Sequence, residues 1–399
     1  MHLITGGESH GPELVAVLVG IPAGLALSRD DIDRELARRQ HGAGRGGRQK
    51  IEKDRVEVRG GLRDGKTLGS PLVLAIPNRD FENWAQVMDP WSVDPGACQR
   101  RRLVTPRPGH ADLAGAWKYG HREDLRNVLE RASARETAAR VAAGAVCKKL
   151  LAAVGVEIRS GVLALGEKIL HSGPPSFELL QKVRDDSPLR TPFPEREDEL
   201  VRYVEETKHR GDTLGGIVGV VARGVPPGLG SYVHWEQRLD GQLAQGIMAV
   251  QAVKAVAIGA GLETATLPGS RAHDPILPGT RGLGRGSNHA GGLEGGVSNG
   301  EDLVLRAFMK PIATLRDPLP SVNVQTLEAQ PAAYERSDVT AVPALGVILE
   351  AVVAFVLARA LLAKFGGDHL EDLLAAVEAF RARLAGWGPE GFVARRRYE

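Results

Sequence analysis

The chain has 399 residues, enough for two or three domains or for one large α/β or α+β domain. Its 51 lysines and arginines nearly balance 49 aspartates and glutamates, and a net charge of +2 excludes a general attraction to nucleic acid or to a membrane. Cys98 and Cys147 lie far apart without a C-x-x-C pair, so we predict neither a disulfide framework nor a metal site. The start, MHLITGGESHGPE, predicts no secretory signal and therefore a cytoplasmic protein.

The N-terminal part of the chain predicts two strands and a helix between them. Residues 14–21 (LVAVLVGI) and 70–78 (SPLVLAIPN) are short β-branched runs bounded by glycine and proline, so we expect strands there. Residues 28–40 (SRDDIDRELARRQ) predict a helix capped by Ser28, because an acidic first turn and a basic last turn suit the helix dipole.

Five further segments complete the prediction. An alanine-rich stretch predicts a long helix over 133–155, and a second helix is expected over about 237–259. Residues 187–210 predict a loop followed by a surface helix, whereas 278–300 are too rich in glycine for regular structure and are expected to form a loop. The apolar window 343–365 is long enough to span a membrane, but it contains an acidic and a basic residue, so we predict a buried core helix.

An internal repeat relates the two halves of the chain. Residues 7–25 (GESHGPELVAVLVGIPAGL) align without a gap with 211–229 (GDTLGGIVGVVARGVPPGL) and match at seven positions. His10 of the first copy meets Leu214 of the second, while the flanking glycines and a hydroxyl residue recur. We therefore expect two similar units of sheet plus helix.

The GESHG stretch at 7–11 also fits the G-x-S-x-G pattern of the hydrolase nucleophile elbow. An elbow needs a strand before it and a helix after it, whereas the run that follows Pro12 predicts a strand. Because the second copy keeps the hydroxyl and lacks the histidine, we interpret the turn as scaffold. His10, rather than Ser9, is the expected functional residue.

Arginine is concentrated in RRQHGAGRGGRQK (38–50), in RRRLVTPRPGH (100–110) and at positions 131 and 135. Guanidinium groups bind phosphate and carboxylate with paired hydrogen bonds, so these segments suit a small polyanion or a nucleic-acid backbone. The glycines of the first segment favour a loop that closes over a ligand. A second histidine, His110, follows Arg107 in a turn-rich stretch, which indicates acid–base chemistry at an anionic site.

Taken together, five segments resemble the chorismate synthase family, in the family's order and over nearly the whole chain. They are GGESHGP (6–12), RPGHAD (107–112), KYGHREDLRNVLERASARETAARVAAGA (118–145), SNHAGGLEGGVSNG (287–300) and RSDVTAVPA (336–344). The resemblance implies a 1,4-trans elimination of phosphate from 5-enolpyruvylshikimate 3-phosphate to give chorismate, in aromatic amino acid biosynthesis. It also implies a need for reduced FMN without net redox change. Such a substrate carries roughly four negative charges at neutral pH, which accounts for the arginines.

The resemblance implies roles for particular residues. His10 would protonate the departing phosphate, His110 would act beside the flavin ring, and Asp338 would act near flavin N5. At Ala132, where many family members have serine, a backbone contact is implied. The residues implied for FMN are Arg131, Ala132, Ser133, Gln251, Ala252, Gly296, Lys310, Pro311, Ile312, Ala313, Thr314 and Arg336. Those implied for the substrate or NADP are Ser9, Arg39, Arg45, Arg48, Arg107 and Arg135, with Arg336 also facing the substrate.

The implied fold is α+β, a β-α-α-β sandwich with internal pseudo-twofold duplication. The chain would form one domain over 1–399, with repeat units at about 1–155 and 205–365, assembled as a homotetramer without nucleic-acid or membrane partners. NADPH or an external flavin reductase would reduce the FMN. On the residues alone two alternatives stay open. A nucleic-acid-binding module would bind RNA in a strongly salt-dependent way, and an ordinary flavin oxidoreductase would consume a nicotinamide for each product.

Overall fold

The computed structural model describes residues 1–45, 53–279, 282–335 and 338–385. Within them lie two main antiparallel sheets, with strand orders β1-β2-β6-β3 and β10-β15-β9-β7-β8. The first sheet contains β1 (His2–Gly6), β2 (Glu13–Val19), β3 (Glu57–Gly60) and β6 (Leu72–Pro77). The second contains β7 (Glu157–Leu165), β8 (Lys168–Ile169), β9 (Gly216–Arg223), β10 (Val253–Ile258) and β15 (Leu303–Met309).

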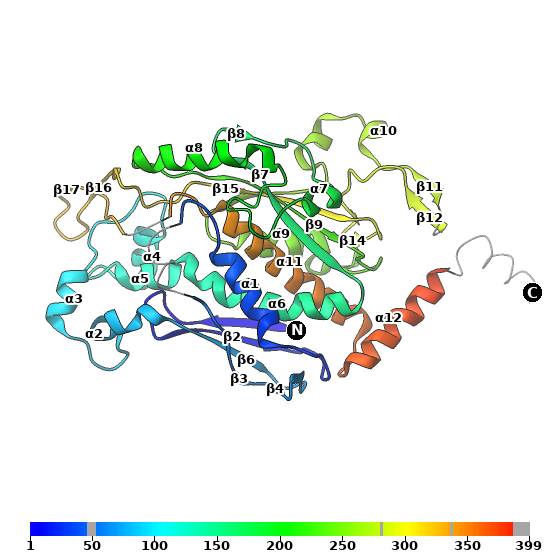
Figure 1. Ribbon diagram of the computed structural model, residues 1–399, viewed down its shortest axis with the longest axis horizontal. Helices are drawn as coiled ribbons and strands as arrows, with labels where there is room; N and C mark the ends of the chain where they lie inside the picture. Colours follow the sequence, from blue (N-terminus) through cyan, green and yellow to red (C-terminus); the bar gives the residue numbers. More distant parts are fainter. Residues whose placement is uncertain (46–52, 280–281, 336–337, 386–399) are drawn as a thin grey trace, which may run out of the picture.

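Helices fill the space between the two sheets (Figure 1). The helix α6 (Thr137–Ala153) packs on β2 and β6, and α11 (Val342–Phe365) packs on β7 and β9. These two helices pack against each other, so the core runs from one sheet through both helices to the other. The helices α1 (Arg29–Gln40) and α9 (Leu239–Met248) pack beside this pair.

The remaining elements are short or peripheral. Most helices of the 79–132 region lie at the left end of the view in Figure 1. The other helical elements are η2 (Arg79–Asn83), α2 (Ala85–Met88), α3 (Pro95–Arg101), α4 (Asp112–Tyr119), α5 (Arg126–Ala132), η3 (Ala134–Glu136), α7 (Phe177–Gln181), η4 (Pro194–Arg196), α8 (Glu197–His209), η5 (Trp235–Gln237), η6 (Gly261–Thr266), α10 (Gly269–Ala272) and α12 (Leu370–Ala385). The other strands form two-stranded ribbons: β4 (Leu62–Arg63) with β5 (Lys66–Thr67), β11 (Ile276–Gly279) with β12 (Gly282–Arg285), β13 (Leu293–Glu294) with β14 (Val297–Ser298), and β16 (Pro320–Val322) with β17 (Ala329–Pro331).

Several predictions from the sequence are confirmed. The strands predicted at 14–21 and 70–78 are β2 and β6, and the surface helix predicted within 187–210 is α8. The helix α1 begins after Ser28, whose hydroxyl accepts a hydrogen bond from the Asp31 amide in a capping box. The helix α11 is long and apolar enough to cross a membrane, yet most of its apolar window is buried inside the protein, as expected of a core helix.

Two predicted helix boundaries and one predicted loop are wrong. The helix predicted over 237–259 ends at Met248, because Ala252 takes a positive φ of 67° and the β-branched run after it pairs with β15 as β10. The glycine-rich segment 278–300 is not a plain loop, since it contributes to the β11–β12 and β13–β14 ribbons. The helix predicted over 133–155 begins with a 3₁₀ turn and becomes α-helical only at Thr137.

The two copies of the sequence repeat occupy equivalent positions in different sheets. The first turn leads into β2 and the second into β9, and each strand lies inside its sheet. Gly7 and Gly211 both have a positive φ, at 95° and 74°, a conformation that glycine adopts without strain. The turn at 7–11 therefore joins one strand to the next, which excludes the nucleophile elbow.

Candidate active site

His10 is held in the turn between β1 and β2 by an acidic residue of α5. The Nδ1 atom of His10 lies 2.8 Å from Oε1 of Glu130, and the His10 amide donates to Oε2 of Glu130 at 2.8 Å. The imidazole stacks on Trp84, with ring centroids 3.9 Å apart and planes 24° apart. Ser9 is buried, and its amide donates to the Glu130 carbonyl at 2.9 Å. The histidine therefore has its orientation fixed on two sides.

His110 has a similar carboxylate partner at the start of α4. Its Nδ1 lies 2.6 Å from Oδ1 of Asp112, which is buried and also accepts from the guanidinium of Arg107 at 2.8 and 3.0 Å. Burial acts to raise the pKa of Asp112, but hydrogen bonds from His110 and Arg107 hold it well below its usual range. An ionised carboxylate only accepts hydrogen bonds, so the contact with Asp112 needs a proton on Nδ1 of His110, whereas Nη2 of Arg107, which lies 3.0 Å from the same nitrogen, can only donate. Arg107 also donates to Thr314 at 3.0 Å.

A cluster of buried arginines lies at the C-terminal end of α1 and the N-terminal end of α6. Asp54 forms a short ion pair with Arg135 at 2.7 Å and a longer one with Arg39 at 3.6 Å. Arg39 donates from Nε to Thr137 at 3.0 Å. Burial lowers the pKa of Arg39 to about 10, although Asp54 opposes the shift. The side chain therefore stays cationic at neutral pH.

Arg45 and Asp338, which are far apart in the sequence, also join this cluster. Their side chains form an ion pair at 2.7 Å, and Arg45 also donates to the Arg39 carbonyl at 3.2 Å. Among the residues that the structure describes, Arg39, Arg45 and Arg135 outnumber the carboxylates that pair with them, those of Asp54 and Asp338. The cluster thus has a surplus of positive charge inside the protein, which suits a bound anion.

Asn78, at the end of β6, connects the arginines to the histidine turn. Its Oδ1 accepts from Arg135 at 2.8 Å, and its Nδ2 donates to the Gly11 carbonyl at 2.7 Å and to the Ser9 carbonyl at 3.3 Å. The backbone that carries His10 is therefore linked through one amide side chain to the arginine cluster.

The residues implied for FMN begin a second series of contacts. Arg131 donates to the carbonyl groups of Thr5 and Gly7 at 2.9 and 3.1 Å, and the Thr5 hydroxyl donates to Glu136 at 2.7 Å. Glu136 also accepts from Nε2 of Gln251 at 3.4 Å. Residues near positions 5, 131, 136 and 251 are in this way brought to one place.

The series continues toward His110. The Ala252 carbonyl accepts from the Lys310 amide at 3.0 Å, and the Lys310 ammonium group donates to the Gly109 carbonyl. The segment 310–314 consequently lies beside the turn that carries His110. Its last residue, Thr314, is the one bonded to Arg107.

One atom in this region is ready to accept a hydrogen bond from a ligand. Oε1 of Gln251 is buried and has no hydrogen-bond partner among the residues that the structure describes. A buried unsatisfied acceptor is costly unless a ligand or water supplies a donor. The ring N–H of a flavin is such a donor, and the cations of Arg131 and Lys310 suit its phosphate or its reduced, anionic ring, so the residues fit FMN.

Gly296, which lies in the described part of the chain, is hydrogen-bonded elsewhere. Gly296 lies in the β13–β14 turn, where its carbonyl accepts from the Leu239 amide at the start of α9, whereas Gln251 follows the other end of that helix. Arg48 and Arg336 lie outside the described residues.

Sequence reasoning missed five side chains that hold the site together: Trp84, Asp54, Asn78, Asp112 and Glu130. The sequence offered one signal for Glu130, an acidic residue directly after the apolar Val128 and Leu129, and the structure shows all three buried on a short helix. Asp112 lies two residues after His110 in the same turn. Trp84 and Asn78 gave no such signal, since only the folded chain brings them beside residues 9–11.

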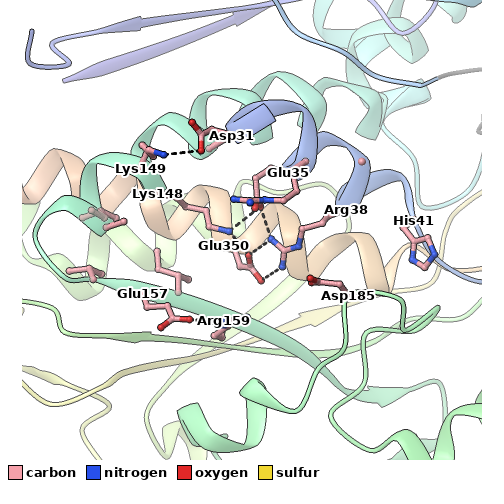
Figure 2. A pocket seen from close by; sticks show the side chains of 17 residues that line it. Asp31, Glu35, Arg38, His41, Lys148, Lys149, Glu157, Arg159, Asp185 and Glu350 are labelled. Atoms are coloured by element: carbon pink, nitrogen blue, oxygen red, sulfur yellow. Dashed lines mark hydrogen bonds and ion pairs between the residues drawn. The ribbon is translucent and has the colours of Figure 1, made fainter. Parts of the chain in front are cut away.

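The structure also has a cavity of about 670 Å³ away from these residues, between α1, α6 and β7 (Figure 2). Its charges largely neutralise one another: Glu350 accepts from Arg38 and Lys148 at 2.8 Å each, and Lys149 pairs with Asp31 at 2.9 Å. It contains none of the residues implied for substrate or FMN. The cavity is therefore separate from the residues to which the resemblance assigns the chemistry.

The fold brings together buried cations that can bind a small anion and two carboxylate-paired histidines that can transfer protons, an arrangement suited to an enzyme. Comparison with known proteins identifies the family. A family model for chorismate synthase matches residues 1–362. The chorismate synthase of Thermus thermophilus is 54% identical over 389 residues, which cover 96% of this chain and 99% of that protein. The chorismate synthase of Aquifex aeolicus is 50% identical over 387 residues, covering 94% and 95%.

A solved structure agrees with these relatives. A crystal structure of chorismate synthase superimposes with a TM-score of 0.77 at 41% identity, covering 96% of this chain and 98% of that one. The chain belongs to the chorismate synthase family.

Proposed function

We propose that the cluster around His10 is where this chain carries out the reaction of its family, the 1,4-trans elimination of phosphate from 5-enolpyruvylshikimate 3-phosphate to give chorismate. The observation that carries the proposal is the position of His10. It lies against a buried carboxylate and is connected through Asn78 to the buried arginines. A proton donor and a polyanion site are therefore adjacent.

The arginines would hold the substrate. Its phosphate and two carboxylates need several cations in one place, and Arg39, Arg45 and Arg135 provide them with guanidinium planes that can each bind two oxygens. Arg107 is engaged with Asp112 and Thr314, so we assign it to holding His110 in place. The resemblance suggests that Arg48 and Arg336 also contribute.

His10 would act as the general acid. Protonation of a phosphate oxygen as the C–O bond breaks turns a poor leaving group into a better one. His110 would stand beside the flavin ring with Nδ1 bonded to Asp112, and Asp338 would act near flavin N5. Its ion pair with Arg45 connects Asp338 to the residues that would hold the substrate.

Reduced FMN would be held by the residues of the second series of contacts, which includes Arg131 and Thr314. Gln251 would accept a hydrogen bond at its buried Oε1, and Ala132 would contribute only backbone atoms. When bound, the flavin supplies the transient electron donation that weakens the C–O bond, and it is recovered without net redox change. The protein's part is to bind, to orient and to supply protons. NADPH or an external reductase would keep the flavin reduced.

We further infer the architecture and setting of the protein. The order sheet, helix pair, sheet, with the two repeated turns in different sheets, supports the β-α-α-β sandwich with internal duplication and one domain over the chain. Exposed aromatic side chains such as Tyr232 and Trp235 support assembly into a homotetramer. Light scattering should then give a mass four times the 42.6 kDa of one chain. The soluble biosynthetic role supports a cytoplasmic location.

The decisive experiment is anaerobic incubation of the protein with photoreduced FMN and 5-enolpyruvylshikimate 3-phosphate, with phosphate release and chorismate absorbance followed together. We expect both products in equal amounts and no consumption of nicotinamide beyond the reduction of the flavin. Stoichiometric nicotinamide oxidation would favour an ordinary flavin oxidoreductase. Salt-sensitive binding of RNA without turnover would favour a nucleic-acid-binding module.

A further inference from the structure

Glu130 contacts both the backbone and the side chain of His10, although the backbone contact alone would hold the turn. Its carboxylate accepts from the His10 amide at 2.8 Å and also lies 2.8 and 3.0 Å from Nδ1 of the imidazole. In the second copy of the turn, the equivalent amide of Leu214 donates to the Val339 carbonyl at 2.9 Å. A backbone carbonyl is therefore enough to hold such a turn, and the bond to the imidazole in the first copy is additional.

The ionisation of Glu130 fixes which nitrogen of His10 carries a proton. Burial acts to raise the pKa of Glu130, but hydrogen bonds from His10 and the charge of Arg126 outweigh burial and lower it. The carboxyl is consequently ionised at neutral pH and can only accept hydrogen bonds. The proton between the two side chains must then lie on Nδ1, so any proton that His10 exchanges with a ligand passes through Nε2.

The plane of the imidazole is fixed as well. The ring stacks on Trp84, whose indole Nε1 donates to Asp80 at 3.2 Å and whose ring also contacts the guanidinium of Arg101 at 3.8 Å from its centroid. Glu130 itself is held by Arg126 at 3.3 Å. Both the hydrogen bond and the stacking surface are thus positioned by other side chains, which is what a preorganised proton donor needs.

We propose that Glu130 is a positioning residue for the elimination: it holds His10 in the Nδ1-protonated form, directs Nε2 toward the substrate, and stabilises the imidazolium until its proton is transferred. In that step the C–O bond breaks with its electron pair leaving on the phosphate oxygen, while the electron pair of the substrate C–H bond forms the new double bond and its proton leaves to the acceptor proposed above, Asp338. The Nε2 proton of His10 goes to that phosphate, and the imidazole returns to its neutral Nδ1–H form. Glu130 stays ionised throughout. The inference rests on the proposed role of His10 as the acid.

The test is a double-mutant cycle on the complete enzyme with reduced FMN. Glu130→Gln should lower kcat by about 10- to 100-fold with little change in KM, because positioning and charge are lost while the substrate cations remain. Glu130→Asp, which keeps the charge, should recover part of that loss. In the His10→Ala background, Glu130→Gln should have less than about a 2-fold further effect, because Glu130 acts only through His10.

The controls separate this inference from the proposed function and from misfolding. Glu123→Gln, at an exposed glutamate paired with Arg102 at 2.9 Å, should leave kcat unchanged. Each variant's thermal midpoint and FMN affinity are measured alongside. If Glu130→Gln does not fold, Glu130→Asp takes its place in the cycle, with loss of kcat expected in the wild-type background only.

Three outcomes would count against the proposals. Full activity of His10→Ala would overturn the role of His10 in the proposed function. Loss of activity in His10→Ala with normal kcat in both Glu130 variants would overturn only the role of Glu130. Equal losses from Glu130→Gln with and without His10 would show that Glu130 acts on the site by another route.

Discussion

At the scale of single residues, the site is built by pairing each candidate proton donor with a buried carboxylate. His10 has Glu130, and His110 has Asp112. Such partners orient an imidazole and select its tautomer, as in other proteins that use histidine for proton transfer. The sequence displays the histidines, whereas their partners become visible only in the folded chain.

We expect His10→Ala and His10→Leu to lower turnover by about 10²- to 10⁴-fold, the usual contribution of a general acid. The cost in stability should be small, about 1–3 kcal/mol, because Glu130 keeps its hydrogen bonds to Arg126 and to the backbone amide of residue 10. Leucine is the natural residue at the same place in the second copy. Kinetics and thermal unfolding of both variants check this, and unfolded variants would refute the scaffold interpretation of the turn.

We expect Asp338→Asn to retain FMN affinity and lose turnover. The amide oxygen can still accept from Arg45, which preserves the local structure, while the charge and the proton-accepting ability are lost. Flavin affinity is measured by fluorescence titration and turnover by phosphate release. Asp317→Asn, at an exposed aspartate, serves as the control. A large loss of flavin affinity would instead show that Asp338 is structural.

At the scale of elements, the close contact of α6 with α11 determines where the site residues lie. A Cβ on Gly144 would lie 2.5 Å from the Cα of Ala351, so only glycine allows this approach. The N-terminal end of α6 follows the 3₁₀ turn that carries Arg135, and α11 follows the segment that carries Asp338. The packing of two core helices thus sets the spacing of two charged groups of the site.

Gly144→Ala should therefore lower the free energy of unfolding by about 1–3 kcal/mol, because the added methyl group forces the two helices apart. Gly241→Ala is the matched control. A Cβ at this position of α9 meets no atom within 4 Å. Since alanine favours helix, this variant should be neutral or stabilised by up to about 1 kcal/mol. Equal thermal midpoints for the two variants would contradict the account of the α6–α11 contact.

At the scale of the whole molecule, buried carboxylates paired with cations connect the two sheets and the helices between them. Glu350 of α11 bonds to Arg38 of α1, Lys148 of α6 and Ser160 of β7. Burial acts to raise the pKa of Glu350, but the charges of Lys148, Arg38 and Arg190 lower it well below its usual value. Hydrogen bonds and nearby cations also lower the pKa values of Glu130, Glu136 and Asp112, although burial acts to raise them.

The free energy of unfolding should consequently decrease as the pH becomes acidic. A carboxyl whose pKa is lower in the folded than in the unfolded state stabilises the fold above its unfolded pKa of about 4, and this contribution disappears as the pH falls through the folded value. The thermal midpoint should therefore be steady near neutral pH and fall below about pH 4. Scans between pH 7 and pH 3 test this, and Glu350→Gln should show a weaker pH dependence. A midpoint independent of pH would contradict it.

The sequence by itself determined the strands β2 and β6, the capped helix α1, the buried helix α11 and the repeated turn. Each of these depends on local signals: a β-branched run bounded by glycine and proline, a capped N-terminus, an apolar window or matched glycines. Local signals misplaced the end of α9, because the pairing of β10 with β15 overrides the helical propensity of an alanine-containing run. The family motifs likewise gave the histidines, the arginines and Asp338.

Only the tertiary structure decided how these residues act on one another. Residues 10 and 130, 45 and 338, and 135 and 54 are far apart in the chain, yet each pair is in contact. The side chains that fix tautomer, ring plane and charge are ordinary residues in the sequence, and packing alone brings them to the site. No spacing rule predicts such contacts, because they depend on how two sheets and the helices between them close around a common core.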